Sequence, residues 1–234
     1  MTVQVGFFQQ FFFEYYPYIA ATIFVVGSLL RFNYAQYGWK SGSSQFVSKR
    51  GMRVASNFFH VGILLLFLGH LVGLLTPESL YTLVISVHHK QMMAMIAGGV
   101  FGTFAFIGLT FLVFRRLFVT RVRTTGSWMD IFIILLLYVQ LMLGLATIPL
   151  SAIHSSGTEM EALAYWAQHI VTFRAGAAAF IVNVPMVFKL HIILGLTIFV
   201  IFPFTRLVHI FSAPVLYVTR VGYQIVRRRG SGGY

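Results

Sequence analysis

The sequence predicts an all-α membrane protein with five transmembrane helices. Of its 234 residues, 58% are hydrophobic and only 9% are charged, a profile typical of integral membrane proteins. Five apolar segments are each long enough to cross about 30 Å of hydrocarbon as a helix. The basic residues lie mostly between these segments, as expected for membrane loops rather than for a nucleic-acid surface.

The five predicted spans are, in chain order, residues 11–30, 54–75, 91–114, 131–153 and 186–211. The last span contains Lys189 near one end and Arg206 near the other, so we expect it to be tilted, with charged groups that snorkel. Pro203 should kink it, because proline lacks a backbone N–H donor. We expect one transmembrane domain over residues 1–225 and a basic, Gly/Ser-rich tail over residues 226–234.

The distribution of basic residues predicts how the chain crosses the membrane. One side collects 14 of the 17 lysines and arginines, and the other side holds only Lys90, Arg174 and Lys189. The positive-inside rule makes the basic side cytoplasmic. Five spans then place the N-terminus outside and the C-terminus in the cytoplasm.

The longest connection, residues 155–185, contains one helical pattern. Residues 160–173 read MEALAYWAQHIVTF, and we expect them to form a helix. Such a helix either lies in the outer membrane interface or packs as an aromatic helix against the bundle. The sequence leaves both alternatives open.

Four histidines in two apolar spans are the main candidates for function. The second span holds His60 and His70, and the fifth holds His191 and His209. Because the two spans run in opposite directions, depth pairs His60 with His209 near the inner face and His70 with His191 near the outer face. Imidazoles inside a bilayer are costly and usually functional.

Two imidazole pairs on facing helices suggest two haem groups, each held from both sides. A haem with two imidazole ligands has no open axial position, which suits electron transfer rather than oxygen binding. The chain has no cysteine, so thiolate ligation of an iron–sulfur cluster and covalent haem attachment are excluded. The alternative is that the histidines only form hydrogen bonds within the bundle or relay protons.

The spacing of the histidines requires an irregularity in the fifth span. His60 and His70 are separated by about 15 Å of helical rise, whereas His191 and His209 would be separated by about 27 Å on a continuous helix. We expect tilt and the Pro203 kink to absorb the difference. Glycines near the histidines should let a flat macrocycle approach the backbone: Gly62, Gly69, Gly73 and Gly195.

Several long stretches resemble the gamma subunit of respiratory nitrate reductases, a membrane cytochrome b subunit. These stretches are YPYIA, ASNFFHVGILLLFLGHLVGLLTP, KQMMAMIAGG, LATIPLSAIH and FKLHIILGLTIFVIFPFTRLVHIFSAPVLYVTR. The combination of H-x9-H with the H…FPFTRLVH block is the specific part of this resemblance, which covers almost the whole chain.

The resemblance implies a function in the bacterial cytoplasmic membrane. It implies two haem b groups, the inner one on His60 and His209 and the outer one on His70 and His191. It also implies that quinol is oxidised near the outer haem, with Lys90 and Gly69 at the quinol site. The implied partners are an iron–sulfur (beta) subunit and a molybdopterin catalytic (alpha) subunit on the cytoplasmic side; nitrate chemistry is not in this chain.

Three of the candidate residues also have a second interpretation. From the residues alone, Lys90 is more readily explained as an interfacial lysine that snorkels. Arg116 and Arg206 are candidates to pair with haem propionates, but they could equally be charges that set topology. Two alternatives remain for the whole chain: a related cytochrome b subunit of a sulfite-, heterodisulfide- or nitrite-linked complex, or a histidine-based transporter.

Overall fold

The computed structural model describes residues 5–39, 51–153 and 157–212, and within these ranges every regular element is a helix. The described residues contain five helices long and apolar enough to span a membrane: Phe7–Tyr34, Met52–Leu75, Val87–Phe118, Trp128–Ile153 and Met186–Phe204. The predicted all-α class and the five spans are confirmed. The basic tail at residues 226–234 lies outside the described residues.

The elements follow one another along the chain. The first span joins α1 (Phe7–Gln10), the π-helical η1 (Phe11–Tyr15) and α2 (Tyr16–Tyr34), and a short 3-10 turn, η2 (Gln36–Gly38), follows. The remaining elements are α3 (Met52–Leu75), α4 (Glu78–Tyr81), α5 (Val87–Phe118), α6 (Thr120–Thr124), α7 (Trp128–Ile153), α8 (Thr158–Val171), α9 (Ala177–Phe180), α10 (Met186–Ile201), η3 (Phe202–Phe204) and η4 (Arg206–Ser212).

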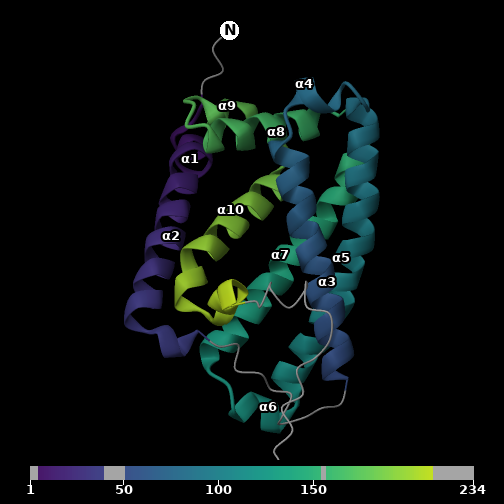
Figure 1. Cartoon of the computed structure of the whole chain (residues 1–234). Coiled ribbons are helices and arrows are strands. Elements are labelled where there is room, and N and C mark those ends of the chain that lie inside the picture. The colour runs from purple at the N-terminus through teal and green to yellow at the C-terminus, as the bar shows by residue number, and fades with distance from the viewer. Residues whose placement is uncertain (1–4, 40–50, 154–156, 213–234) are drawn as a thin grey trace, which may run out of the picture.

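The spans form a row of neighbours rather than a closed ring. Helix α3 packs on α5, α5 on α7, α7 on α10, and α10 on α2, and α10 crosses the bundle obliquely (Figure 1). Helix α3, which carries His60 and His70, is not packed closely against α10, which carries His191. The packing that holds these two helices in place comes from α5, α7 and α2.

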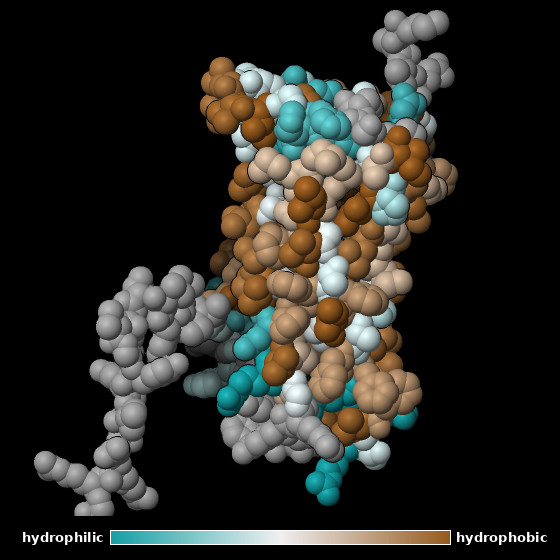
Figure 2. Space-filling model, turned by 90° about the vertical axis from the view of Figure 1, so that its right-hand side faces the viewer, coloured by the Kyte–Doolittle hydropathy of each residue, from teal (hydrophilic) through white to brown (hydrophobic). Residues whose placement is uncertain are grey.

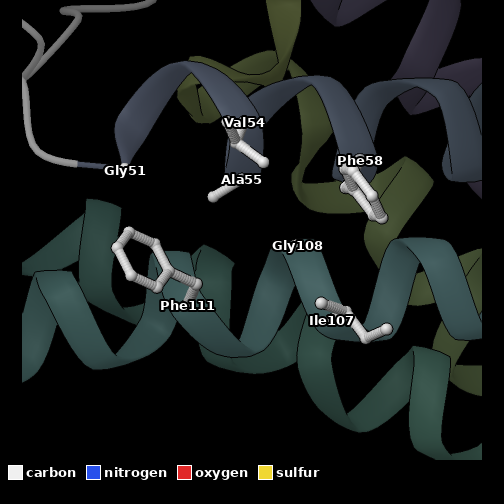
Figure 3. Close-up of a pocket in the computed structure, with 7 residues that line it drawn as sticks. All are labelled: Gly51, Val54, Ala55, Phe58, Ile107, Gly108 and Phe111. Carbon is white, nitrogen blue, oxygen red and sulfur yellow. The ribbon is translucent and has the colours of Figure 1, made fainter.

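Two glycines bring α3 and α5 into backbone contact. A Cβ on Gly62 would lie 2.5 Å from the backbone nitrogen of Ala105, and one on Gly108 would lie 2.4 Å from that of Phe59. Small residues at such crossings let helices associate closely in lipid. Gly62 thus serves helix packing, and the expectation that it makes room for a macrocycle is wrong. Figure 3 shows the shallow apolar hollow beside Gly108 in this contact.

The outer surface of the bundle is an apolar belt between two polar ends. Figure 2 shows hydrophobic side chains covering the middle of the molecule and hydrophilic ones gathered toward its ends. Large apolar side chains in this belt are highly exposed, among them Leu64 at 61% and Ile96 at 62%. Exposed apolar residues on all five spans are the surface expected in lipid, and the protein is a multi-pass membrane protein.

Helix α8 lies across one end of the bundle and packs against it (Figure 1). Its Trp166 is buried, and the indole N–H donates to the carbonyl of Phe13 at 2.8 Å. The amide of Gln168 donates to the carbonyl of Leu74 at 3.0 Å, near the end of α3. Of the two alternatives for residues 160–173, the structure favours a helix packed on the bundle. The region of residues 154–156 lies outside the described residues.

The fifth span ends its α-helix earlier than expected. Helix α10 stops at Ile201, and the 3-10 turns η3 and η4 follow, separated by an extended Thr205 (φ −114°, ψ 176°). The Arg31 guanidinium donates to the carbonyls of Pro203 and Thr205 at 2.6 and 2.8 Å, which satisfies backbone groups released by the break. Pro203 therefore marks the end of the helix, not a kink in a continuous one.

Candidate functional site

The structure brings the four histidines together as two pairs. The ring centres of His60 and His209 lie 6.4 Å apart, and those of His70 and His191 lie 6.1 Å apart. The ring planes make angles of 78° in the first pair and 36° in the second. The two pairs involve the same partners that the depth argument matched.

The break after Ile201 explains how both pairs form. The ten residues from His60 to His70 span about 15 Å in helix α3. A continuous α-helix would carry His209 about 27 Å from His191. Because the chain leaves the α-helix at Ile201, His209 comes from a 3-10 turn and meets His60.

Each of the four imidazoles has its Nδ1 atom next to a backbone carbonyl. The distances are 2.7 Å for His60 to Ser56 and for His70 to Leu66, 2.6 Å for His209 to Arg206, and 3.2 Å for His191 to Gln140. A carbonyl only accepts hydrogen bonds, so each Nδ1 carries the proton and donates it. The Nε2 atom of each ring then keeps a lone pair, which is the form of histidine that binds a metal.

The spacing of each pair fits a haem iron between its rings. An imidazole nitrogen lies about 2 Å from a bound metal and about 1 Å from its own ring centre, so two axial imidazoles place their ring centres about 6 Å apart. Both observed spacings agree with this value. Within residues 5–39, 51–153 and 157–212, no three His, Asp or Glu side chains converge on one point. Two protein ligands suit a haem, whereas a structural zinc ion takes four.

The His60–His209 pair faces a cavity with a cluster of charges. This cavity is lined by His60, His209, Arg116, Asp130 and Arg206, together with apolar residues of α5 and α7. Asp130 forms a salt bridge with Arg116 and lies 3.7 Å from the guanidinium of Arg206. Two arginines sharing one aspartate leave a net positive charge beside this pair, which suits an added carboxylate.

Lys90 is a buried cation with an aromatic neighbour. Its side chain is 8% exposed, and its ammonium lies 3.7 Å from the ring centre of Tyr81. In the described part of the chain, the Lys90 Nζ atom has no hydrogen-bond partner. It also lies in the first turn of α5, where the helix dipole disfavours a positive charge. A buried ammonium without a hydrogen bond is costly even with the Tyr81 ring and the negative charge of Glu78 nearby, so packing alone does not explain this lysine.

The polar groups at the end of the bundle covered by α8 are linked across elements. The Tyr165 hydroxyl of α8 donates to a carboxylate oxygen of Glu78 in α4. This hydrogen bond, with a smaller effect of burial, raises the pKa of Tyr165 to about 12. Tyr81 belongs to the same short helix as Glu78. The Tyr81 ring next to the Lys90 ammonium is therefore connected, through Glu78 and Tyr165, to helix α8.

The predicted glycines differ in their surroundings. A Cβ on Gly69 or on Gly73 would meet no atom within 4 Å, so the backbone beside His70 is open. A Cβ on Gly195 would lie 3.1 Å from the amide nitrogen of Gln140. Sequence reasoning missed three contributors to the sites: Tyr81, Asp130 and Gln140. Asp130 and Gln140 carried a usable signal, because polar residues in or beside apolar spans often have a specific role.

Comparison with known proteins gives a consistent assignment along almost the whole chain. The family model of the nitrate reductase gamma subunit matches residues 9–229. The respiratory nitrate reductase 2 gamma chain of Escherichia coli (strain K12) is 52% identical over 219 residues, covering 94% of this chain and 96% of that protein. The nitrate reductase gamma chain of Bacillus subtilis (strain 168) is 41% identical over 215 residues, covering 91% and 95%.

Proposed function

Because this chain belongs to the nitrate reductase gamma subunit family, we propose that it oxidises a membrane quinol and delivers the electrons to a cytoplasmic-side partner. The family makes the chain a membrane subunit of a nitrate reductase complex, an oxidoreductase. The proposal of quinol oxidation and electron transfer rests on one observation. Two imidazole pairs lie at two levels of one bundle, and the ring centres within the pairs are 6.1 and 6.4 Å apart.

His60 and His209 would hold an inner haem b, and His70 and His191 an outer one. Such a group supplies a one-electron carrier without an open axial position. The carbonyls of α3, α7 and the turn before His209 fix the tautomer of each ring and aim its Nε2 atom. Arg116 and Arg206 would pair with propionates on the inner side, where Asp130 holds them together.

Lys90 would bind a quinone oxygen at the outer end. Its ammonium brings three donors and has none of them in a hydrogen bond within the described residues. A donor or cation at the oxygen favours oxidation of quinol, because it stabilises the negative charge left when a proton departs. The open backbone at Gly69, next to His70, would let a flat quinol ring approach.

The direction of transfer follows from the proposed topology. The N-terminus lies outside and the C-terminus inside, as the distribution of 14 of 17 basic residues to one side predicts. The two protons of each quinol leave on the outer side, while its electrons move inward to an iron–sulfur (beta) subunit. That subunit serves a molybdopterin (alpha) subunit that reduces nitrate. The process is electrogenic and takes place in the bacterial cytoplasmic membrane.

The purified complex tests this proposal in two steps. Pyridine haemochrome analysis should give two non-covalent haem b groups per chain, and addition of a quinol should reduce them before nitrate reoxidises them. A folded and active complex without haem would contradict the proposal, and would favour a role for the histidines in proton relay. A complex whose haem is reduced by other donors but never by quinol would contradict the assignment of the electron source.

A further inference from the structure

His191 differs from the other three paired histidines in where its Nδ1 atom points. His60, His70 and His209 each donate to a carbonyl three or four residues earlier in the chain. His191 instead donates across to α7, where the carbonyl oxygen of Gln140 accepts at 3.2 Å. The orientation of this ring is therefore set by a neighbouring helix.

Gln140 and His191 are joined in both directions. While the Gln140 carbonyl accepts from the imidazole, the Gln140 side-chain amide donates to the backbone carbonyl of His191 at 3.0 Å. The same amide nitrogen lies 3.5 Å from the His191 Nε2 atom. One glutamine thus touches the backbone, the Nδ1 side and the Nε2 side of this imidazole.

Two glycines provide the space for this arrangement. One turn after Gln140, a Cβ on Gly144 would lie 2.9 Å from the Cε1 atom of the His191 ring. One turn after His191, a Cβ on Gly195 would lie 3.1 Å from the Gln140 amide nitrogen. The ring lies directly against the α7 backbone, so its plane has little freedom.

We propose that Gln140 is a positioning residue that sets the reduction potential of the outer haem through His191. The inference rests on the proposed function, because it requires His191 as an axial ligand. Hydrogen bonding at Nδ1 makes an imidazole a stronger electron donor to iron and favours the oxidised state. By binding the His191 backbone, the Gln140 side chain holds the imidazole against the backbone carbonyl of Gln140. Among the four paired histidines, only His191, a ligand of the outer haem, has this hydrogen bond to a neighbouring helix.

The test is a redox titration of both haems in the assembled complex, with the inner haem as the internal control. Gln140→Met removes the amide donor at nearly constant volume. We expect the potential of the outer haem to become more positive and that of the inner haem to stay unchanged. The low-spin ferric EPR signal of the outer haem should also change, because its anisotropy depends on the angle between the two imidazole planes.

Gly144→Ala provides an independent variant that leaves Gln140 intact. Its new methyl group would push the His191 ring, so it should alter the outer EPR signal and not the inner one. Gly99→Ala is the matched control, since its Cβ would lie 4.0 Å from Ile148 in ordinary contact. This control should change neither haem.

The results of these measurements either support or overturn the positioning role of Gln140. A shift confined to the outer haem, or loss of the outer haem alone, supports the inference. Unchanged potentials and EPR signals in both variants overturn it, as does an equal change at both haems, which would mean a general effect on the bundle. A wild-type complex with no haem would instead refute the proposed function.

Discussion

Replacing Lys90 by methionine should separate function from stability. The ammonium gains about 0.5–2 kcal/mol from its contact with the Tyr81 ring. Against this stands the cost of burying a charge with no hydrogen-bond partner in the described residues, which amounts to several kcal/mol. Methionine keeps the apolar length of the side chain and removes the charge. The variant should therefore be at least as stable as the wild type.

The same substitution should impair quinol oxidation. A hydrogen bond from a charged donor contributes about 1.5–3 kcal/mol. At about 1.4 kcal/mol for each tenfold change, quinol-driven turnover should fall roughly 10- to 100-fold. Haem content should remain normal, and electrons from an artificial donor that bypasses the quinol site should still reach nitrate.

The assay compares Lys90→Met with Lys189→Met in the purified complex. In the proposed topology Lys189 is also on the outer side, but its ammonium donates to the Val182 carbonyl at 2.8 Å. Turnover with quinol, turnover with the artificial donor and the thermal midpoint by circular dichroism are measured for both. Unchanged quinol turnover in Lys90→Met would refute the reasoning, and so would a large loss of stability or of haem.

Three further predictions concern topology, packing and the outer polar link. Reporters fused after Ser79 and after Tyr234 should report opposite sides of the membrane; the same side for both would contradict the proposed topology. Gly62→Ala should destabilise the chain by about 1–3 kcal/mol, because its Cβ would lie 2.5 Å from the Ala105 backbone. Gly73→Ala should change the stability little, and equal thermal midpoints of the two variants would refute this prediction. The pKa of Tyr165 should be about 12, and Glu78→Gln should lower it because the hydrogen bond to a carboxylate and the negative charge that opposes phenolate are both lost. Phenolate difference spectra, with Tyr165→Phe to assign the transition, would show no change if Glu78 were not the cause.

The spans and the matching of histidines by depth followed from local properties of the sequence. The length of an apolar segment decides whether it crosses a membrane as a helix. An isolated strand does not cross, because its backbone groups would lack hydrogen bonds in lipid. Opposite helix directions suggested His60 with His209 and His70 with His191. These arguments need only distances along each helix, so they did not depend on unknown packing.

The remaining features depend on contacts between distant segments. Pro203 signalled a disturbance, but the length of α10 depends on Arg31, whose guanidinium binds the carbonyls after the break. Gly62 lies near His60 in sequence, yet it faces α5, and only the relative rotation of the two helices decides this. The contact of Gln140 with His191 joins residues 51 positions apart, which no local pattern predicts.

The central claim is that two cross-helix histidine pairs each hold one haem. Haem content and the redox spectra of single-alanine variants at His60, His70, His191 and His209 test it most directly. His60→Ala and His209→Ala should lose the same spectral component, and His70→Ala and His191→Ala should lose the other, with the chain still in the membrane. If His60→Ala and His70→Ala lost the same component, or if every variant kept both, the account would be contradicted.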